Sequence, residues 1–285
     1  MAGDAPGKDP AGGRARVSHV PQTVLVTGST AGMGRYLATL LAEMGWTVLA
    51  HGRDKKRLDE LVTTVPGNVV PLRADLSSLA QVDKLAATVR KKTKRLHVLV
   101  NNAGVGFGAP DEERQLSADG HELRLAVNYL APVLLTRRLV PLLAASAPSR
   151  VVNVGSLGQE PMDRDDIEMT EQYSGVQAYR RAKLALAAFT FDLADELRGS
   201  GVTVNCIHPA TFMATTMVLD SGISPRSSIA DGGDATLRLI TDPSLARTTG
   251  DFFDGNRAVA AHRDAYDTGF RRWLRRQTDA MLPAV

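Results

Sequence analysis

Short apolar runs alternate with amphipathic stretches along most of the chain. The first run, Thr23–Val26, is β-branched and apolar throughout, which is typical of a buried strand. Glycines follow it, and apolar residues then recur every three or four positions up to Gly45, as on one face of a helix. Similar apolar runs occur at residues 47–50, 69–72, 96–100, 151–154 and 202–207. Together these runs predict six buried strands.

The stretches between the runs predict helices. Besides the helix that ends near Gly45, the periodicity places helices at residues 56–65, 79–91, 120–144 and 178–198. Pro132 should kink the long third helix of this list, and Pro141 should lie near its end. Residues 211–232 are expected to be irregular with some helix, and residues 257–280 to form a terminal helix.

Strands and helices that alternate in this way imply right-handed crossovers and a parallel sheet covered on both faces. The pattern therefore predicts a single-domain α/β fold over residues 21–285, a Rossmann-type doubly wound parallel sheet with helices on both faces. Residues 1–20 are rich in Gly, Pro and Ala and lack the apolar core of a signal peptide. We expect a flexible tail there.

Composition narrows the class of protein. Cys206 is the only cysteine, which excludes an intrachain disulfide and a cysteine-ligated zinc site, and no metal is expected. No apolar run reaches the roughly 18 residues of a membrane span, so a cytoplasmic protein is expected. The formal net charge of +3 gives little support to a nucleic-acid partner, and none is expected.

The densest basic cluster lies near the C-terminus, and helical spacing puts its members on roughly one face. A solvated helix surface is favoured for it over a phosphate-binding or partner-binding surface. Its members are Arg271, Arg272, Arg275 and Arg276.

The first strand leads into a glycine-rich turn, Thr27-Gly28-Ser29-Thr30-Ala31-Gly32-Met33-Gly34. Glycines allow a tight turn and let backbone N–H groups approach a pyrophosphate. The helix that opens here adds free N–H groups and the positive end of its dipole. A strand before the turn and a helix after it favour a dinucleotide site over a turn that needs glycines for geometry alone.

Four motifs in this order resemble the short-chain dehydrogenase/reductase family over residues 22–280. They are the TGxxxGxG turn, Asn101-Asn102-Ala103-Gly104 after a strand, a strand that ends at Ser156, and Tyr179-Arg180-Arg181-Ala182-Lys183. The resemblance implies an oxidoreductase, a nicotinamide dinucleotide and a homodimer or homotetramer. The residues that it implies for cofactor binding are Gly28, Ser29, Thr30, Gly32, Met33, Gly34, Asp75, Leu76, Asn102, Ala103, Gly104, Tyr179, Lys183, Pro209 and Thr211.

The end of the second strand bears on which dinucleotide is bound. In Rossmann-type sites an acidic residue at this place binds the ribose hydroxyls of NAD. Here Gly52 holds the place and Arg53 follows it. A glycine does not repel a 2′-phosphate, and an arginine offers it a bidentate, always charged partner. Within the family this arrangement implies NADP(H), although Asp54 is only one residue further on and a surface role for Arg53 stays open.

Tyr179 is the candidate general acid/base. A free tyrosine has a pKa near 10, and a pKa shifted downward would favour proton transfer at neutral pH. Lys183 lies one helical turn on, where its positive charge would stabilise a phenolate. Ser156 would hydrogen-bond the substrate carbonyl oxygen, and Asn128 resembles the family's asparagine of a proton relay. Tyr173 lacks such a lysine, because its fourth following residue is Gln177.

Some features depart from the common family pattern. Ala182 stands where many relatives have serine, and His208-Pro209-Ala210 replaces the usual Pro-Gly. Twenty-three positions separate Ser156 from Tyr179, and this long gap resembles the retinol-dehydrogenase-like branch.

Residues 210–232 are expected to form a lid over the site. Its apolar side chains either line a pocket or pack as in any lid helix; they are Phe212, Met213, Met217, Val218 and Leu219. We expect a medium-sized, mainly apolar ketone, aldehyde or alcohol as substrate, for example a secondary-metabolite ketone or a lipid-like aldehyde.

Two alternatives to a carbonyl reductase or alcohol dehydrogenase stay open. One is a dinucleotide-binding regulatory protein without turnover, and the other is an epimerase or dehydratase that uses the hydride internally.

Overall fold

One mixed sheet forms the centre of the computed structural model, which describes residues 22–109 and 112–284. The expected tail at residues 1–20 lies outside this part of the chain. Within it the strand order is β3-β2-β1-β4-β5-β6-β7-β8, and all neighbours pair in parallel except β7 and β8. The strands are β1 Thr23–Val26, β2 Thr47–Gly52, β3 Asn68–Arg73, β4 Val98–Asn101, β5 Ser149–Val154, β6 Val202–His208, β7 Phe252–Asp254 and β8 Arg257–Val259.

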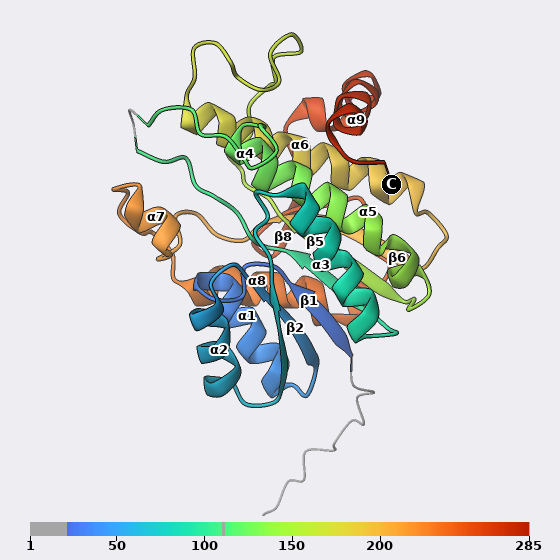
Figure 1. Cartoon of the computed structure of the whole chain (residues 1–285). Coiled ribbons are helices and arrows are strands. Elements are labelled where there is room, and N and C mark those ends of the chain that lie inside the picture. Colours follow the sequence, from blue (N-terminus) through green and yellow to red (C-terminus); the bar gives the residue numbers. More distant parts are fainter. Residues whose placement is uncertain (1–21, 110–111, 285) are drawn as a thin grey trace, which may run out of the picture.

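Helices cover both faces of the sheet (Figure 1). The longer ones are α1 Gly32–Glu43, α2 Lys55–Thr64, α3 Leu79–Lys92, α5 Ala131–Ala144, α6 Gly175–Glu196, α8 Ile229–Thr241 and α9 Thr268–Met281. The shorter ones are α4 Leu123–Leu125, a π-helical turn Ala126–Leu130, α7 Thr216–Asp220, and 3₁₀ turns Pro243–Leu245 and Arg263–Tyr266.

Alternate residues of each central strand enter two separate cores. In β1, Leu25 joins the core beneath α3, α5 and α6, while Val24 and Val26 join the core beneath α1 and α8. All three side chains are fully buried, which confirms the predicted doubly wound sheet. The strand order reverses between β1 and β4, and ligands of such sheets bind outside the carboxyl ends of the strands at this point.

The long helix predicted over residues 120–144 is interrupted. It starts at Leu123, passes through the π-helical turn, and becomes α-helical again at Ala131. Pro132 explains the change, because it has no N–H for the carbonyl four residues earlier and its ring would clash with that carbonyl. Pro141 lies inside α5, three residues before its end.

The C-terminal third differs most from the sequence prediction. The expected helix over 257–280 begins only at Thr268, because residues 257–259 form β8. The pattern also missed β7 and α8. The α8 helix contains Gly232 and Gly233, which are poor helix formers, but these glycines let it pack closely on Met213 and Tyr36.

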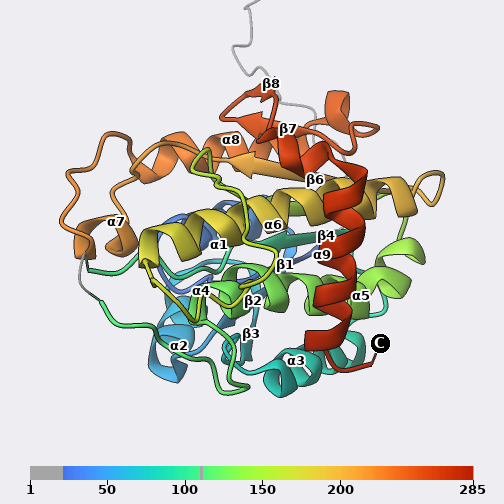
Figure 2. The same ribbon diagram turned by 90° about the horizontal axis from the view of Figure 1, so that it is seen from above.

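The basic face of α9 is partly paired within the chain. Figure 2 shows α9 running across α6, and Arg271 and Arg275 form ion pairs with α6 carboxylates, among them Asp195 at 3.0 Å and Asp192 at 2.7 Å. The other two arginines of the cluster are exposed. Among residues 22–109 and 112–284, no helix has the length and apolar character needed to cross a membrane.

Candidate active site

The turn between β1 and α1 consists of glycines in close backbone contact. Gly28 and Gly32 have φ values of +69° and +51°, in the left-handed region that favours glycine. A Cβ on Gly34 would overlap the Gly28 carbonyl oxygen. Ala31 precedes α1 without providing a side-chain cap, so the first N–H groups of the helix stay available to an anion. This geometry fits a pyrophosphate group.

Several side chains of the turn point inward. The fully buried Ser29 hydroxyl donates to the Val26 carbonyl (2.6 Å), and the Met33 side chain lies in the core. The side chains of Ser29 and Met33 are therefore not available to a ligand. The Thr30 methyl group lies 2.6 Å from the place of a Cβ on Gly52, so a larger residue at the end of β2 would displace the turn.

A buried histidine supports the turn from β2, and the sequence prediction missed it. His51 is 3% exposed, and its Nδ1 accepts a hydrogen bond from the Gly28 N–H (3.2 Å). Its Nε2 lies 3.1 Å from the Ala74 carbonyl, and its own carbonyl accepts from the Ser29 N–H. Burial lowers the pKa of His51 to about 4, which keeps the ring neutral near pH 7. A histidine late in a strand is the only sequence signal of this role.

The loop after β4 is tied to the same turn. The Thr27 hydroxyl oxygen accepts from the N–H groups of Asn102 (2.9 Å) and Ala103 (3.0 Å). Asn102 in turn donates from Nδ2 to the Thr27 carbonyl (2.7 Å). A Cβ on Gly104 would lie 3.0 Å from Asn128 Oδ1. The structure thus brings these predicted cofactor residues together with the turn.

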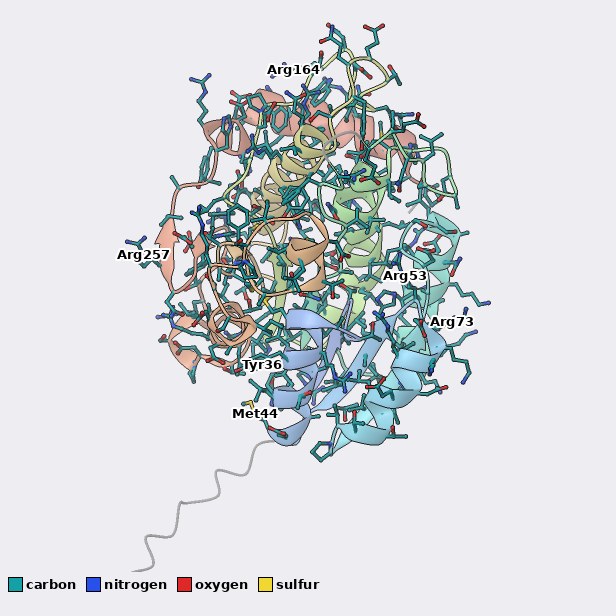
Figure 3. The ribbon with its side chains drawn as sticks, turned by 90° about the vertical axis from the view of Figure 1, so that its left-hand side faces the viewer. Tyr36, Met44, Arg53, Arg73, Arg164 and Arg257 are labelled. Atoms are coloured by element: carbon teal, nitrogen blue, oxygen red, sulfur yellow. The ribbon has the colours of Figure 1, made fainter. Side chains whose placement is uncertain are left out.

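Two exposed arginines lie at the ends of β2 and β3, on the same side of the molecule (Figure 3). Arg73 Nε donates to the Arg53 carbonyl (3.1 Å), and neither guanidinium forms an ion pair with the residues that the structure describes. The Asp75 carboxylate accepts from the Ser77 N–H and hydroxyl, while Leu76 is buried. This edge of the site is therefore positively charged next to one acidic side chain.

Tyr179 and Lys183 project from α6 toward the end of β5, where Ser156 lies. The Tyr179 hydroxyl lies near the Ser156 side chain, whose oxygen accepts from the Gly158 N–H (3.1 Å). The Lys183 ammonium lies 5.6 Å from the centre of the Tyr179 ring and donates to the Val154 carbonyl (2.8 Å). The structure therefore assembles the three predicted reacting residues in one place.

The expected lowering of the Tyr179 pKa does not come from the protein's own groups. Burial raises the pKa of this hydroxyl, and the nearby Ser156 side chain opposes that effect only in part. Lys183 directs its ammonium to Val154, and its own burial lowers its pKa to about 8. The downward shift expected from the sequence is thus wrong for this arrangement of side chains.

Asn128 lies in the π-helical turn, and both ends of its side-chain amide are bonded to the loop after β4. Its Oδ1 accepts from the Val105 N–H (2.8 Å) and its Nδ2 donates to the Val105 carbonyl (3.0 Å). A relay through this amide is therefore not what the geometry favours. The Asn128 backbone carbonyl is the better candidate, because Pro132 four residues on has no N–H to donate to it.

Comparison with known proteins identifies the family. The family model for short chain dehydrogenase matches residues 22–222. The chain belongs to the short-chain dehydrogenase family. It is 32% identical to human retinol dehydrogenase 13 over 276 residues, which is 89% of this chain and 82% of that protein. It is 40% identical to mouse polyprenol dehydrogenase over 201 residues, 66% of this chain and 59% of that protein.

A solved structure gives the same assignment. NADPH-bound carbonyl reductase from chicken fatty liver superposes with a TM-score of 0.66 at 25% identity, covering 85% of this chain and 99% of that one. This short-chain dehydrogenase therefore has the family's Rossmann fold, with the retinol-dehydrogenase-like branch as its place in the family. It is an oxidoreductase with a nicotinamide dinucleotide as cofactor.

The segment after β6 of this short-chain dehydrogenase lies against the glycine turn. The Thr215 methyl group is 3.2 Å from the position that a Cβ on Gly32 would take. Met217 is 2.8 Å from the position that a Cβ on Gly106 would take. Thr215 was not predicted, although it lies within the expected lid. The Thr211 hydroxyl pairs with His208 (3.1 Å), and Pro209 packs against α8.

The apolar residues of the expected lid differ in burial and in what they contact. Met213 packs on Gly232 of α8, and Val218 is buried. Leu219 is 57% exposed and does not line the site. Met217 lies against the loop after β4, next to Gly104 and Gly106.

Proposed function

We propose that the protein is an NADPH-dependent oxidoreductase that interconverts a medium-sized, mainly apolar carbonyl compound and the corresponding alcohol. The observation that carries the proposal is the cluster of Tyr179, Ser156 and Lys183 at the end of β5, beside a turn that fits a pyrophosphate. A protein that only bound the dinucleotide would not need all three side chains gathered at the end of one strand.

Each of these residues has a separate task. A bound nicotinamide supplies or accepts the hydride at the substrate carbon. In the direction of reduction, Tyr179 gives its hydroxyl proton to the carbonyl oxygen, and Ser156 donates a hydrogen bond to the same oxygen as negative charge develops. The nearby Lys183 ammonium stabilises the tyrosinate that remains. The raised pKa of Tyr179 keeps it protonated at neutral pH, as a general acid must be.

The preference for NADPH rests on the positive edge formed by Arg53 and Arg73. A guanidinium binds the 2′-phosphate in a bidentate manner, and Gly52 presents no carboxylate that would repel it. The carboxylate of Asp54 caps the start of α2 by accepting from the Arg57 N–H (3.1 Å), and its negative charge acts on Arg73, so we assign the 2′-phosphate contact to Arg53 first.

An apolar substrate is supported by the surroundings of Tyr179. The Phe107 ring contacts the Tyr179 ring edge-on, with 5.4 Å between centroids, and Met217 packs over the same loop. Retinol and polyprenol, which appear in the names of the two relatives, are alcohols with long apolar chains. We therefore place this protein's substrates among apolar alcohols, aldehydes and ketones.

The reaction is tested with a panel of apolar aldehydes and ketones and with NADPH oxidation as the readout. We expect turnover by the wild type and a loss of at least about 100-fold in kcat/KM for Tyr179→Phe, since general acid catalysis contributes on this order. Tyr266→Phe, which removes a half-exposed hydroxyl that accepts from the Ala261 N–H, is the matched control. Equal rates in wild type and Tyr179→Phe would refute the mechanism.

Two other results of this panel would favour the alternatives. Tight NADPH binding without turnover of any carbonyl would point to a regulatory protein. A converted product without net NADPH consumption would point to an epimerase or dehydratase.

The cofactor preference has its own test. We expect Arg53→Ala to weaken NADPH binding about tenfold, the equivalent of one charge-assisted contact, and to leave NADH binding unchanged. Arg257→Ala, at the opposite edge of the sheet in Figure 3, serves as the control for loss of one surface charge. Tighter binding of NADH than of NADPH by the wild type would show that the Arg53 argument is wrong.

A further inference from the structure

A network of buried charges lies next to the candidate active site, and the proposed reaction does not use it. Its centre is Arg124 of α4, whose side chain is 3% exposed. The guanidinium donates from Nη1 to the Tyr173 hydroxyl (2.6 Å) and from Nη2 to Glu112 (2.9 Å). The Tyr173 hydroxyl in turn donates a hydrogen bond to Glu122 (3.0 Å), whose side chain is 2% exposed. The network therefore joins the loop after β4, α4 and the segment before α6.

The third donor of Arg124 connects this network to the site. Its Nε donates to the Gly106 carbonyl (2.9 Å), directly before Phe107. The Phe107 ring meets the Tyr179 ring edge-on, and the Phe107 carbonyl touches the backbone of Gly175, the first residue of α6. The place of Phe107 against Tyr179 thus depends on where Arg124 holds the preceding carbonyl.

The glycines around Phe107 explain why such support is needed. Gly104, Gly106 and Gly108 flank the aromatic residue, and glycine leaves the backbone more freedom than any other residue. Asn128 holds this loop at Val105, and Arg124 holds it one residue later. Two adjacent residues are therefore fixed by side chains from the same helical segment.

Tyr173 is suited to orient the arginine. Burial, together with the charge of Glu122, raises the pKa of Tyr173 to about 12, so its hydroxyl stays protonated and donates to Glu122 while it accepts from Arg124. The long segment between Ser156 and Tyr179 supplies this tyrosine. Its Glu168 also binds the Glu122 N–H (2.8 Å), which fixes the start of α4.

We propose that Arg124 and Tyr173 are positioning residues that hold the Gly106–Phe107 loop against Tyr179 and thereby set the width of the substrate that can reach it. This selection rests on the proposed carbonyl reaction. The positioning itself does not.

The test uses Tyr173→Phe, which keeps the ring and removes only the bridging hydroxyl, and Arg124→Lys, which keeps the charge and loses the three-way geometry. Both are measured with a straight-chain aldehyde and with a bulky cyclic aldehyde. We expect the ratio of kcat/KM for the bulky aldehyde to that for the straight one to change about tenfold, as loss of a hydrogen bond to a charged group permits. The KM for NADPH should stay within about twofold of the wild type, because the glycine turn is untouched.

A second measurement needs no turnover. Hydrogen exchange of the peptide that contains Val105 should become faster in both variants, while exchange of the peptide over residues 28–34 should not change. Tyr266→Phe is the control for loss of a tyrosine hydroxyl elsewhere. An aldehyde ratio and Val105 exchange equal to the wild type, even with a lower Tm, would overturn the proposal and leave the network a purely structural one.

The two readouts separate the proposals. A wild type inactive on every carbonyl would refute the proposed reaction. The exchange measurement would then test the positioning role by itself. Faster exchange at Val105 in the variants would support that role, and unchanged exchange would refute it.

Discussion

His51 makes the stability of the protein depend on pH in a way that can be calculated. The ring accepts from the Gly28 N–H at Nδ1 and donates from Nε2 to the Ala74 carbonyl, so it is neutral and has one defined tautomer. If Nδ1 were protonated, two donors, the ring N–H and the Gly28 N–H, would face each other. The ring would also carry a positive charge although His51 is only 3% exposed. Protonation therefore disrupts the support of the glycine turn.

The sign and size follow from the two pKa values. The ordinary pKa of histidine, 6.5, applies to the unfolded chain, and the folded pKa of His51 is about 4. Above pH 6.5 neither state binds the proton, and the stabilisation is complete. As the pH falls from 6.5 to 4, the unfolded state takes up a proton that the native state does not, so stability falls. The loss amounts to roughly 3 kcal/mol at 1.36 kcal/mol for each pH unit between the two pKa values.

The assay is urea unfolding at several pH values between 7 and 4, for wild type and His51→Asn. The asparagine amide can still accept from the Gly28 N–H but does not titrate. We expect the free energy of unfolding to fall about 3 kcal/mol further in the wild type than in the variant over this range. His97 and His208, whose pKa values burial also lowers, are present in both proteins and cancel. Parallel curves for the two proteins would refute the assignment of His51 as a buried neutral base.

Further predictions concern the turn and the C-terminal helix. Gly34→Ala should weaken dinucleotide binding by at least about tenfold in calorimetry, because the new Cβ would overlap the Gly28 carbonyl oxygen and displace the turn. Tyr129→Phe removes a buried hydrogen bond to Thr278 (2.6 Å) and should cost about 1 kcal/mol in urea unfolding, since that threonine keeps a second partner in α9. Arg275→Ala should cost less than about 1 kcal/mol, and less still in high salt, because the arginine is 43% exposed; a loss that is independent of salt would contradict this.

Local sequence accounts for the first two thirds of the fold. The apolar runs and the periodic stretches between them predict β1 to β6 and most helices, because each element buries a face that its own residues define. The prediction fails where an element depends on a neighbour. The three residues of β7 carry too little pattern, and the glycines of α8 are tolerated because α1 and Met213 pack against them.

The candidate site divides in the same way. Motif spacing placed Tyr179 and Lys183 one helical turn apart and the glycine turn before a helix, since such short-range relations follow from the chain itself. Motif spacing could not show that Asn128 bonds Val105 through its amide, or that Lys183 donates to the Val154 carbonyl. It also could not show that burial raises the pKa of Tyr179.

The sequence by itself thus determined the type of fold, the place of the glycine turn and which residues are candidates for the reaction. Only the tertiary structure decided which polar groups those residues meet. His51 reaches Gly28 across twenty-three positions, and Arg124 reaches Tyr173 across forty-nine. Such contacts depend on the parallel order of the strands and on how segments distant in sequence meet at the edge of the sheet. The burial of these groups, and with it their charge state, is set by that packing and not by their neighbours in the chain.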